Sequence, residues 1–201
     1  MQTILLIEAL ESERVEVEPR HGYRFVVEHT GLGKTQAIVG LLSAISRHRP
    51  AAVVNLGTAG SAALPVGTIA VCRSFVDRDM KLLADYGACW SLEAEAECEL
   101  TYVICSGEPR RVCSTGDRFV TDSLPDGDVC DMEAFAMASL CRHLGLPFVS
   151  VKYVTDIVGQ NSLKAWADKL HDARLALADF MQKKLGALVP DINSKQSKSS
   201  H

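Results

Sequence analysis

The sequence predicts an α/β protein, a three-layer sandwich with a central sheet that is mixed, mostly parallel and twisted. Short apolar segments rich in β-branched residues alternate along the chain with longer segments of helical periodicity. Gly, Pro or Asp bounds the short segments, as is typical of strands. With 201 residues, of which 47% are hydrophobic and 23% charged, the chain can build a sizeable core.

The expected elements follow one another in a regular order. Strands are expected at residues 3–8, 23–30, 51–57, 67–76, 101–107 and 147–156. Helices are expected at 34–48, which precedes Pro50, at 131–144, which precedes Gly145, and at 162–185. No internal repeat or long linker interrupts this order, so we expect a single domain over residues 1–188. Residues 189–201 are polar and rich in small residues, which predicts a flexible tail.

Composition and charge exclude several classes of function. The formal net charge of -4 argues against nucleic acid or an anionic membrane as the main partner, and favours a small molecule. The N-terminus has no basic region and only a short apolar run, so we expect neither a signal peptide nor a membrane span, and a cytoplasmic location. The seven cysteines lack CxxC spacing and predict reduced core residues. The six histidines form no metal-binding pattern, so we expect no metal and no cofactor.

Two candidate motifs lie in the first third of the chain. Glu13, in the sequence Glu11-Ser12-Glu13 after the first strand, could act as a base or position a water, although acids also favour helix starts. Residues 55–61 form a small-residue turn in which the Gly60 backbone could approach a ligand and the Thr58 hydroxyl could bind it. The turn has neither P-loop nor dinucleotide spacing and contains no Arg or Lys, so it suits a phosphate poorly.

Two more candidates lie in the second half. In residues 114–120, Phe119 could stack on a planar base while the backbone beside Val120 reads its edge; the alternative is a core phenylalanine at a corner. In residues 129–156, Glu133 at a helix start could grip sugar hydroxyls, and Asp156 at a strand end could donate a proton. Both acids could instead serve as helix-start or capping residues. Trp166 could fill the core or close over a ligand.

Taken in order, the motifs GLGK, NLGTAG, STGDRFV, DMEAFA and VKYVTD resemble the purine nucleoside phosphorylase and nucleosidase superfamily, and most closely its methylthioadenosine/S-adenosylhomocysteine nucleosidase branch. The resemblance covers nearly the whole chain before residue 189. It implies a nucleoside phosphorylase/hydrolase-like fold, a purine nucleoside as the ligand, and a homodimer.

The resemblance also implies roles for individual residues. Asp156 would protonate the departing purine, and Glu13 would position and deprotonate the attacking water. These two carboxyls need different protonation states, with Asp156 protonated and Glu13 ionised. The remaining residues would bind substrate. Glu133 would hydrogen-bond the ribose hydroxyls, Met132 would pack under the sugar, and Phe119 and Val120 would hold the base. Thr58 would line the sugar and water side, Trp166 would border the pocket, and Gly60 is also among the expected substrate-binding residues.

Water is favoured over phosphate as the nucleophile. Phosphorolytic members of the superfamily have an arginine where this chain has Asn55, and the first strand ends in Glu8 where glycine is common. Two alternatives stay open: a phosphorylase whose phosphate cation is Arg14, Arg78 or a neighbouring subunit's residue, and a non-catalytic nucleoside-binding module. Glu8 itself could tune Glu13 or face solvent. The segment 77–113 leaves little room for the family's helix and longer loop, so the five-prime group of the substrate is open.

Overall fold

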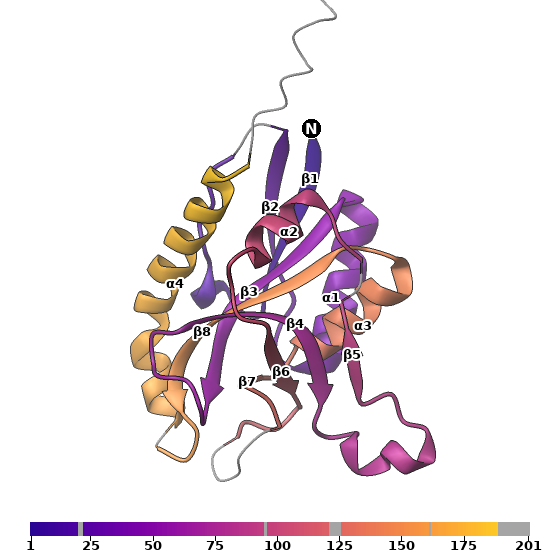
Figure 1. Cartoon of the computed structure of the whole chain (residues 1–201), viewed down its shortest axis with the longest axis vertical. Helices are drawn as coiled ribbons and strands as arrows, with labels where there is room; N and C mark the ends of the chain where they lie inside the picture. Colours follow the sequence, from indigo (N-terminus) through magenta and orange to yellow (C-terminus); the bar gives the residue numbers. More distant parts are fainter. Residues whose placement is uncertain (20–21, 95, 121–125, 161, 189–201) are drawn as a thin grey trace, which may run out of the picture.

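The computed structural model describes residues 1–19, 22–94, 96–120, 126–160 and 162–188 (Figure 1). The expected flexible tail, residues 189–201, lies outside this description. The strands are β1 (Gln2–Glu8), β2 (Tyr23–His29), β3 (Ala52–Ser61), β4 (Ile69–Asp77), β5 (Ser91–Glu93), β6 (Arg111–Thr115), β7 (Val129–Asp131) and β8 (Phe148–Ile157). The helices are α1 (Gly33–His48), α2 (Glu99–Cys105), α3 (Ala134–Leu144) and α4 (Ser162–Gly186), with short 3-10 turns η1 (Glu11–Glu13) and η2 (Lys81–Tyr86).

The strands form a mixed sheet whose pairings close into a ring. β3 pairs with β8, β8 with β4, β4 with β6, β6 with β7, and β7 returns to β3. β1 and β2 extend the sheet from the free side of β3, and β5 extends it from β4. Among the described strands, five of the eight pairings are parallel.

The prediction of an α/β protein with a mixed, mostly parallel sheet is therefore confirmed, but the prediction of an open three-layer sandwich is wrong. The sheet closes because β8 pairs with β3 on one side and with β4 on the other, and because Gly60 near the end of β3 pairs with Cys130 in β7. Pairings of this kind join residues far apart in the chain, so apolar periodicity does not reveal them.

Helices cover both faces of the sheet and bury two cores. Along β1, Leu5 and Ile7 point into the core shared with α1 and α3, while Ile4 and Leu6 point into the core shared with α2 and α4. This alternation is the two-residue period of a strand that is buried on both sides. Figure 1 shows α4 along one side of the molecule and α1 and α3 on the other.

Several predicted elements need correction. Residues 101–107 were expected as a strand but belong largely to helix α2, so the short segment 77–113 does accommodate a helix. The β-branched residues of this segment are typical of a strand. The segment is helical instead, and Leu100 and Ile104, one helical turn apart, pack into the core with α4. Residues 55–61 were expected as a turn but continue β3, which stays paired with β8 to Ser61. Helix α3 begins at Ala134, because residues up to Asp131 form the short strand β7.

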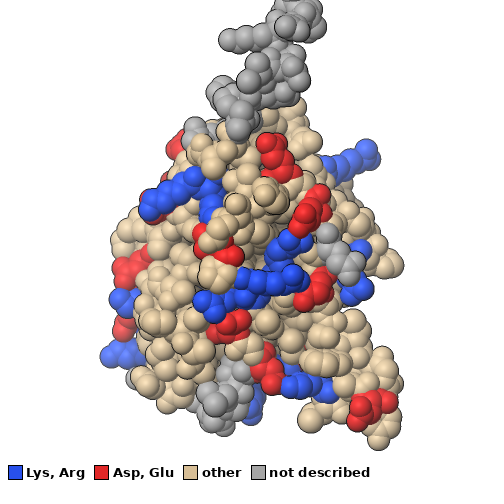
Figure 2. All heavy atoms as spheres, viewed as in Figure 1, with Lys and Arg blue, Asp and Glu red and all other residues tan. Residues whose placement is uncertain are grey.

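The surface drawn in Figure 2 mixes charges of both signs. Ion pairs such as Arg73 with Glu97, Arg110 with Glu93 and Lys184 with Glu108 join basic and acidic side chains across neighbouring elements. Within the described ranges, none of the helices has the length and apolarity needed to cross a membrane.

Candidate active site

A cavity of about 140 Å3 opens where the ends of β3, β7 and β8 meet. Gly60 is the meeting point, because it pairs with Asp156 in β8 and with Cys130 in β7. The structure brings together every residue that the sequence singled out as a site candidate: Glu13, Thr58, Gly60, Phe119, Val120, Met132, Glu133, Asp156 and Trp166 all line this cavity.

Asp156 is held with one oxygen fixed and the other close to a glycine. The Thr155 hydroxyl donates to Asp156 Oδ1 at 2.8 Å, and only 3% of Asp156 is exposed. A Cβ on Gly60 would lie 3.0 Å from Asp156 Oδ2 and 3.3 Å from Cys130 Sγ. The absence of a side chain at Gly60 therefore lets the carboxyl occupy this wall of the cavity.

Glu13 lies at the end of the 3-10 turn η1 and binds β3. Its Oε1 accepts hydrogen bonds from the Thr58 amide at 3.0 Å and from the Thr58 hydroxyl at 2.6 Å. The indole N–H of Trp166, from helix α4, donates to the same hydroxyl at 2.9 Å. A chain of hydrogen bonds thus runs from helix α4 through β3 to one carboxylate oxygen of Glu13.

Glu8 anchors the turn that carries Glu13. Its Oε1 accepts a hydrogen bond from the Val15 amide at 2.7 Å, and its Oε2 lies 3.0 Å from Nε2 of His29. Glu8 is completely buried, so the alternative in which it faces solvent is wrong. Burial raises the pKa of Glu8 to about 8, against the opposing effect of the Val15 hydrogen bond, and the nearby Glu13 carboxylate adds to the rise.

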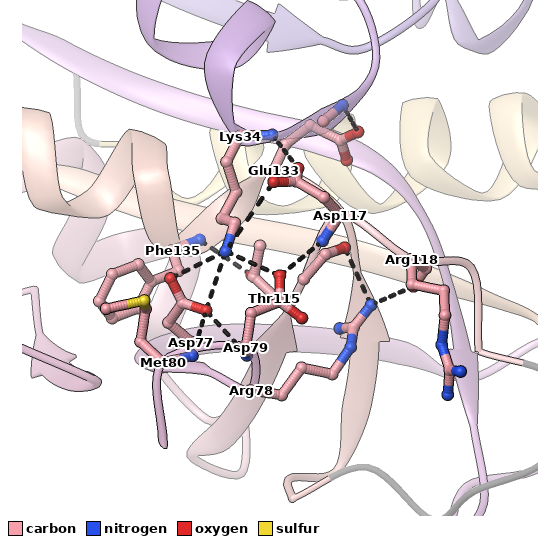
Figure 3. Close-up of polar contacts among 12 residues, drawn as sticks. Lys34, Asp77, Arg78, Asp79, Met80, Thr115, Asp117, Arg118, Glu133 and Phe135 are labelled. Carbon is pink, nitrogen blue, oxygen red and sulfur yellow. Dashed lines mark hydrogen bonds and ion pairs between the residues drawn. The ribbon is translucent and has the colours of Figure 1, made fainter. Parts of the chain in front are cut away.

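Glu133 is bound by the start of helix α1, which explains the GLGK motif. The Gly33 amide donates to Glu133 Oε1 at 2.9 Å, and the next amide, that of Lys34, donates to Asp117 at 2.7 Å (Figure 3). Gly33 has a φ of +84°, and a Cβ there would lie 3.0 Å from Asp117 Oδ1. Burial, followed by repulsion from Asp131, raises the pKa of Glu133 to about 7.

Lys152 is a site residue that the motif analysis missed. Its ammonium lines the cavity and lies 2.9 Å from Asp131 Oδ2, and both side chains are buried. Burial alone would lower the pKa of Lys152, but the charge of Asp131 outweighs it and raises that pKa; Lys152 in turn holds the pKa of Asp131 low. The signal was present in the sequence, because a lysine inside the apolar run VSVKYV needs a buried partner.

Arg78 also lines the cavity, but its guanidinium binds backbone. Nη1 donates to the carbonyls of Ser114 and Asp131, and Nη2 donates to those of Gly116 and Arg118, at 2.6 to 2.9 Å. Figure 3 shows this guanidinium beside the backbone of Arg118, the residue that precedes Phe119 in the sequence. Arg14, the other cation considered for phosphate, pairs with Glu11 at the surface. Arg78 thus fixes the loop that leads to Phe119.

Comparison with known proteins places the chain in a family. The model of the phosphorylase superfamily matches residues 11–188, so the chain belongs to that superfamily. Among curated relatives, the 5'-methylthioadenosine/S-adenosylhomocysteine nucleosidase of Marinomonas sp. (strain MWYL1) is 29% identical over 173 residues, covering 74% of this chain and 75% of the relative. The nucleosidase of the same name from Anoxybacillus flavithermus is 27% identical over 185 residues, covering 80% of each chain.

Solved structures share the fold. A 5'-methylthioadenosine/S-adenosylhomocysteine nucleosidase from Helicobacter pylori superposes with a TM-score of 0.79 at 18% identity, covering 94% of this chain and 99% of that one. The futalosine hydrolase of the same organism superposes with a TM-score of 0.78 at 18% identity, covering 93% and 98%. The expected nucleoside phosphorylase/hydrolase-like fold is confirmed.

Proposed function

We propose that this protein is a purine nucleosidase that hydrolyses the N-glycosidic bond of an adenine nucleoside, methylthioadenosine or S-adenosylhomocysteine being the preferred candidates. The observation that carries the proposal is the convergence of Glu13, Glu133 and Asp156 on one cavity that Phe119 also lines. The names of the curated relatives support the substrate class.

In this proposal the carboxyls divide the work between the two sides of the bond. Asp156 gives its proton to the imidazole-side nitrogen of the purine, so the base can leave with the electron pair of the C1′–N9 bond. A water molecule then attacks C1′ and passes a proton to Glu13. Glu133 binds the ribose hydroxyls, and Met132 packs under the sugar. The products are free base and free sugar.

The remaining residues of the site are proposed to position substrate. Phe119 binds the base by stacking, and Val120 binds it by backbone contacts. Arg78 holds the loop that carries both residues in place. Gly60 leaves room for Asp156, and Trp166 borders the cavity.

Charge supports water rather than phosphate as the nucleophile. Among the described residues that line the cavity, the acids Glu13, Asp131, Glu133 and Asp156 outnumber the bases Arg78 and Lys152. Arg78 is engaged by four carbonyls and Lys152 by Asp131. Asn55, at the position of the phosphorylase arginine, donates to the carbonyl of Ile7 and accepts from the Ser150 hydroxyl. Neither Arg78 nor Lys152 is therefore free to neutralise a phosphate dianion.

The decisive experiment is to incubate the protein with methylthioadenosine, S-adenosylhomocysteine, deoxyadenosine, inosine and futalosine, each with and without phosphate. We expect free base and free reducing sugar from at least one adenine nucleoside, at a rate independent of phosphate. Release that requires phosphate, with a sugar 1-phosphate as product, would support the phosphorylase alternative. Binding without release would support a nucleoside-binding module.

We also propose that residues 1–188 form one domain and that the protein is a cytoplasmic homodimer. The two cores lie on opposite faces of the same sheet, which supports a single domain. Helix α1 exposes the apolar side chains of Ile38, Val39 and Leu42, which supports an oligomer. Light scattering coupled to size-exclusion chromatography tests the dimer, and a mass of one chain would contradict it.

A further inference from the structure

We propose that Trp166 is a positioning residue that orients Glu13 through the hydroxyl of Thr58. The inference rests on the proposed function, in which Glu13 handles the attacking water. It assigns to the indole N–H of Trp166 a task that an aromatic ring without a donor could not perform.

The direction of the hydrogen bonds follows from the chemistry of the three groups. An indole N–H can only donate, whereas a hydroxyl carries one proton and two lone pairs. Since Trp166 Nε1 donates to Thr58 Oγ1 at 2.9 Å, a lone pair of the hydroxyl is occupied. The hydroxyl proton then points to Glu13 Oε1, 2.6 Å away on the other side. The Trp166 N–H thus selects the rotamer in which Thr58 is a donor to the carboxylate.

The consequence for Glu13 is a fixed carboxylate plane. Oε1 receives two hydrogen bonds from the same residue, one from the Thr58 amide at 3.0 Å and one from its hydroxyl. With Oε1 committed to Thr58, the attacking water is bound by Oε2. Only 6% of Glu13 is exposed, so solvent competes weakly for these bonds.

A second contact ties the same helix to the same turn. Arg174, two helical turns beyond Trp166 on α4, donates from Nε to the carbonyl of Arg14, which directly follows Glu13. Helix α4 therefore holds the turn by its backbone through Arg174 and holds the Glu13 carboxylate through Trp166 and Thr58. The Arg174 contact is structural, whereas the Trp166 contact positions the carboxylate of Glu13.

The first test is kinetic and uses the nucleoside that the wild type cleaves fastest. Trp166→Phe keeps an aromatic ring and removes the N–H, and Thr58→Val keeps the side-chain shape and removes the hydroxyl. We expect Trp166→Phe to lower kcat about tenfold with KM changed less than twofold, the order of effect of one net hydrogen bond. In the Thr58→Val background, Trp166→Phe should lower kcat no further, because its route to Glu13 is already lost. Trp90→Phe, at the only other tryptophan, is the matched control and should behave as the wild type.

The second test needs no turnover and shows the hydrogen bond itself. A 15N-labelled sample gives two indole N–H resonances, and Trp90→Phe assigns them. Thr58→Val should move the Trp166 resonance upfield and leave that of Trp90 in place, whereas Thr58→Ser, which keeps the hydroxyl, should hardly move either. This test also covers the case in which Trp166→Phe fails to fold.

The outcomes separate this inference from the proposed function. An active wild type whose Trp166→Phe variant retains kcat, loses only substrate affinity, or adds its full effect to Thr58→Val would overturn the inference and leave the nucleosidase intact. An unchanged Trp166 resonance in Thr58→Val would overturn it as well. A wild type that cleaves none of the nucleosides would overturn both.

Discussion

The ammonium of Lys152 lies 2.9 Å from the carboxylate of Asp131, and the two buried side chains form one wall of the cavity. Asp131 also accepts hydrogen bonds from the Thr115 hydroxyl and the Ala134 amide, so it joins β6, β8 and the start of helix α3. The pair therefore holds the ends of these elements in register around the site.

Lys152→Met should lower the free energy of unfolding by about 3–5 kcal/mol, the usual cost of leaving one buried charge without its partner. Adding Asp131→Asn to this variant should recover part of the loss, because it removes the unpaired charge. Urea unfolding of the two variants and the wild type measures both effects. A single variant as stable as the wild type would show that Asp131 finds another partner or takes up a proton.

Asp156→Asn should lower kcat by about 10²- to 10⁴-fold, the range typical for loss of a general acid. The amide oxygen can still accept the Thr155 hydrogen bond, so we expect the fold and the affinity for substrate to persist. Base release and the melting temperature are the measurements. Asp172→Asn, at an exposed position of α4, is the matched control. Near-normal turnover of Asp156→Asn would remove this residue from the mechanism.

The sequence could place the site because its residues lie at or near strand ends. Asp156 is the last residue but one of the apolar strand β8, and Glu133 follows β7, a strand too short to recognise, yet both reach the same cavity. The residue that the motifs did not indicate, Lys152, lies inside strand β8, and its place in the site depends on its ion pair with Asp131. Local pattern therefore finds residues at the ends of elements better than residues whose role depends on a partner across the sheet.

The closure of the sheet could not be predicted for a related reason. β7 has only three residues, and its antiparallel pairing with β3 joins Gly60 to Cys130, which lie far apart in the sequence. Such a contact leaves no period in the sequence. The longer strands and helices were accessible from the sequence, whereas helix α2, the short strands β5, β6 and β7, and the ring that β6 and β7 help to close were not.

Gly60→Ala should reduce activity more than stability. The added Cβ would lie 3.0 Å from Asp156 Oδ2, closer than side chains normally approach, so the carboxyl must move by a few tenths of an ångström. Movement of a side-chain end costs little folding energy, but misplacement of a proton donor lowers kcat. Comparing kcat with the urea midpoint tests this. Gly57→Ala is the comparison variant. Its Cβ would lie at an ordinary contact distance of 3.5 Å from Glu13 Oε1 and Lys152 Nζ, so it should lower kcat less than Gly60→Ala does.

Glu8→Gln should change how stability depends on pH. Burial raises the pKa of the Glu8 carboxyl to about 8 in the folded protein, whereas in the unfolded chain this carboxyl ionises near pH 4.5. Between these values the folded state binds one more proton, so stability from this group is complete below pH 4.5, declines as pH rises, and is lost above about pH 8. The effect is on the order of a few kcal/mol.

A glutamine has no proton to lose and can still accept the Val15 hydrogen bond with its amide oxygen. Glu133, whose raised pKa gives a trend of the same sign, is present in both proteins and cancels in the comparison. Urea unfolding at pH 5, 6.5 and 8 should therefore show the wild type losing stability relative to Glu8→Gln at each step. Two parallel curves would mean that Glu8 ionises in the folded protein as it does in the unfolded chain, and that His29 or Arg14 compensates its buried charge.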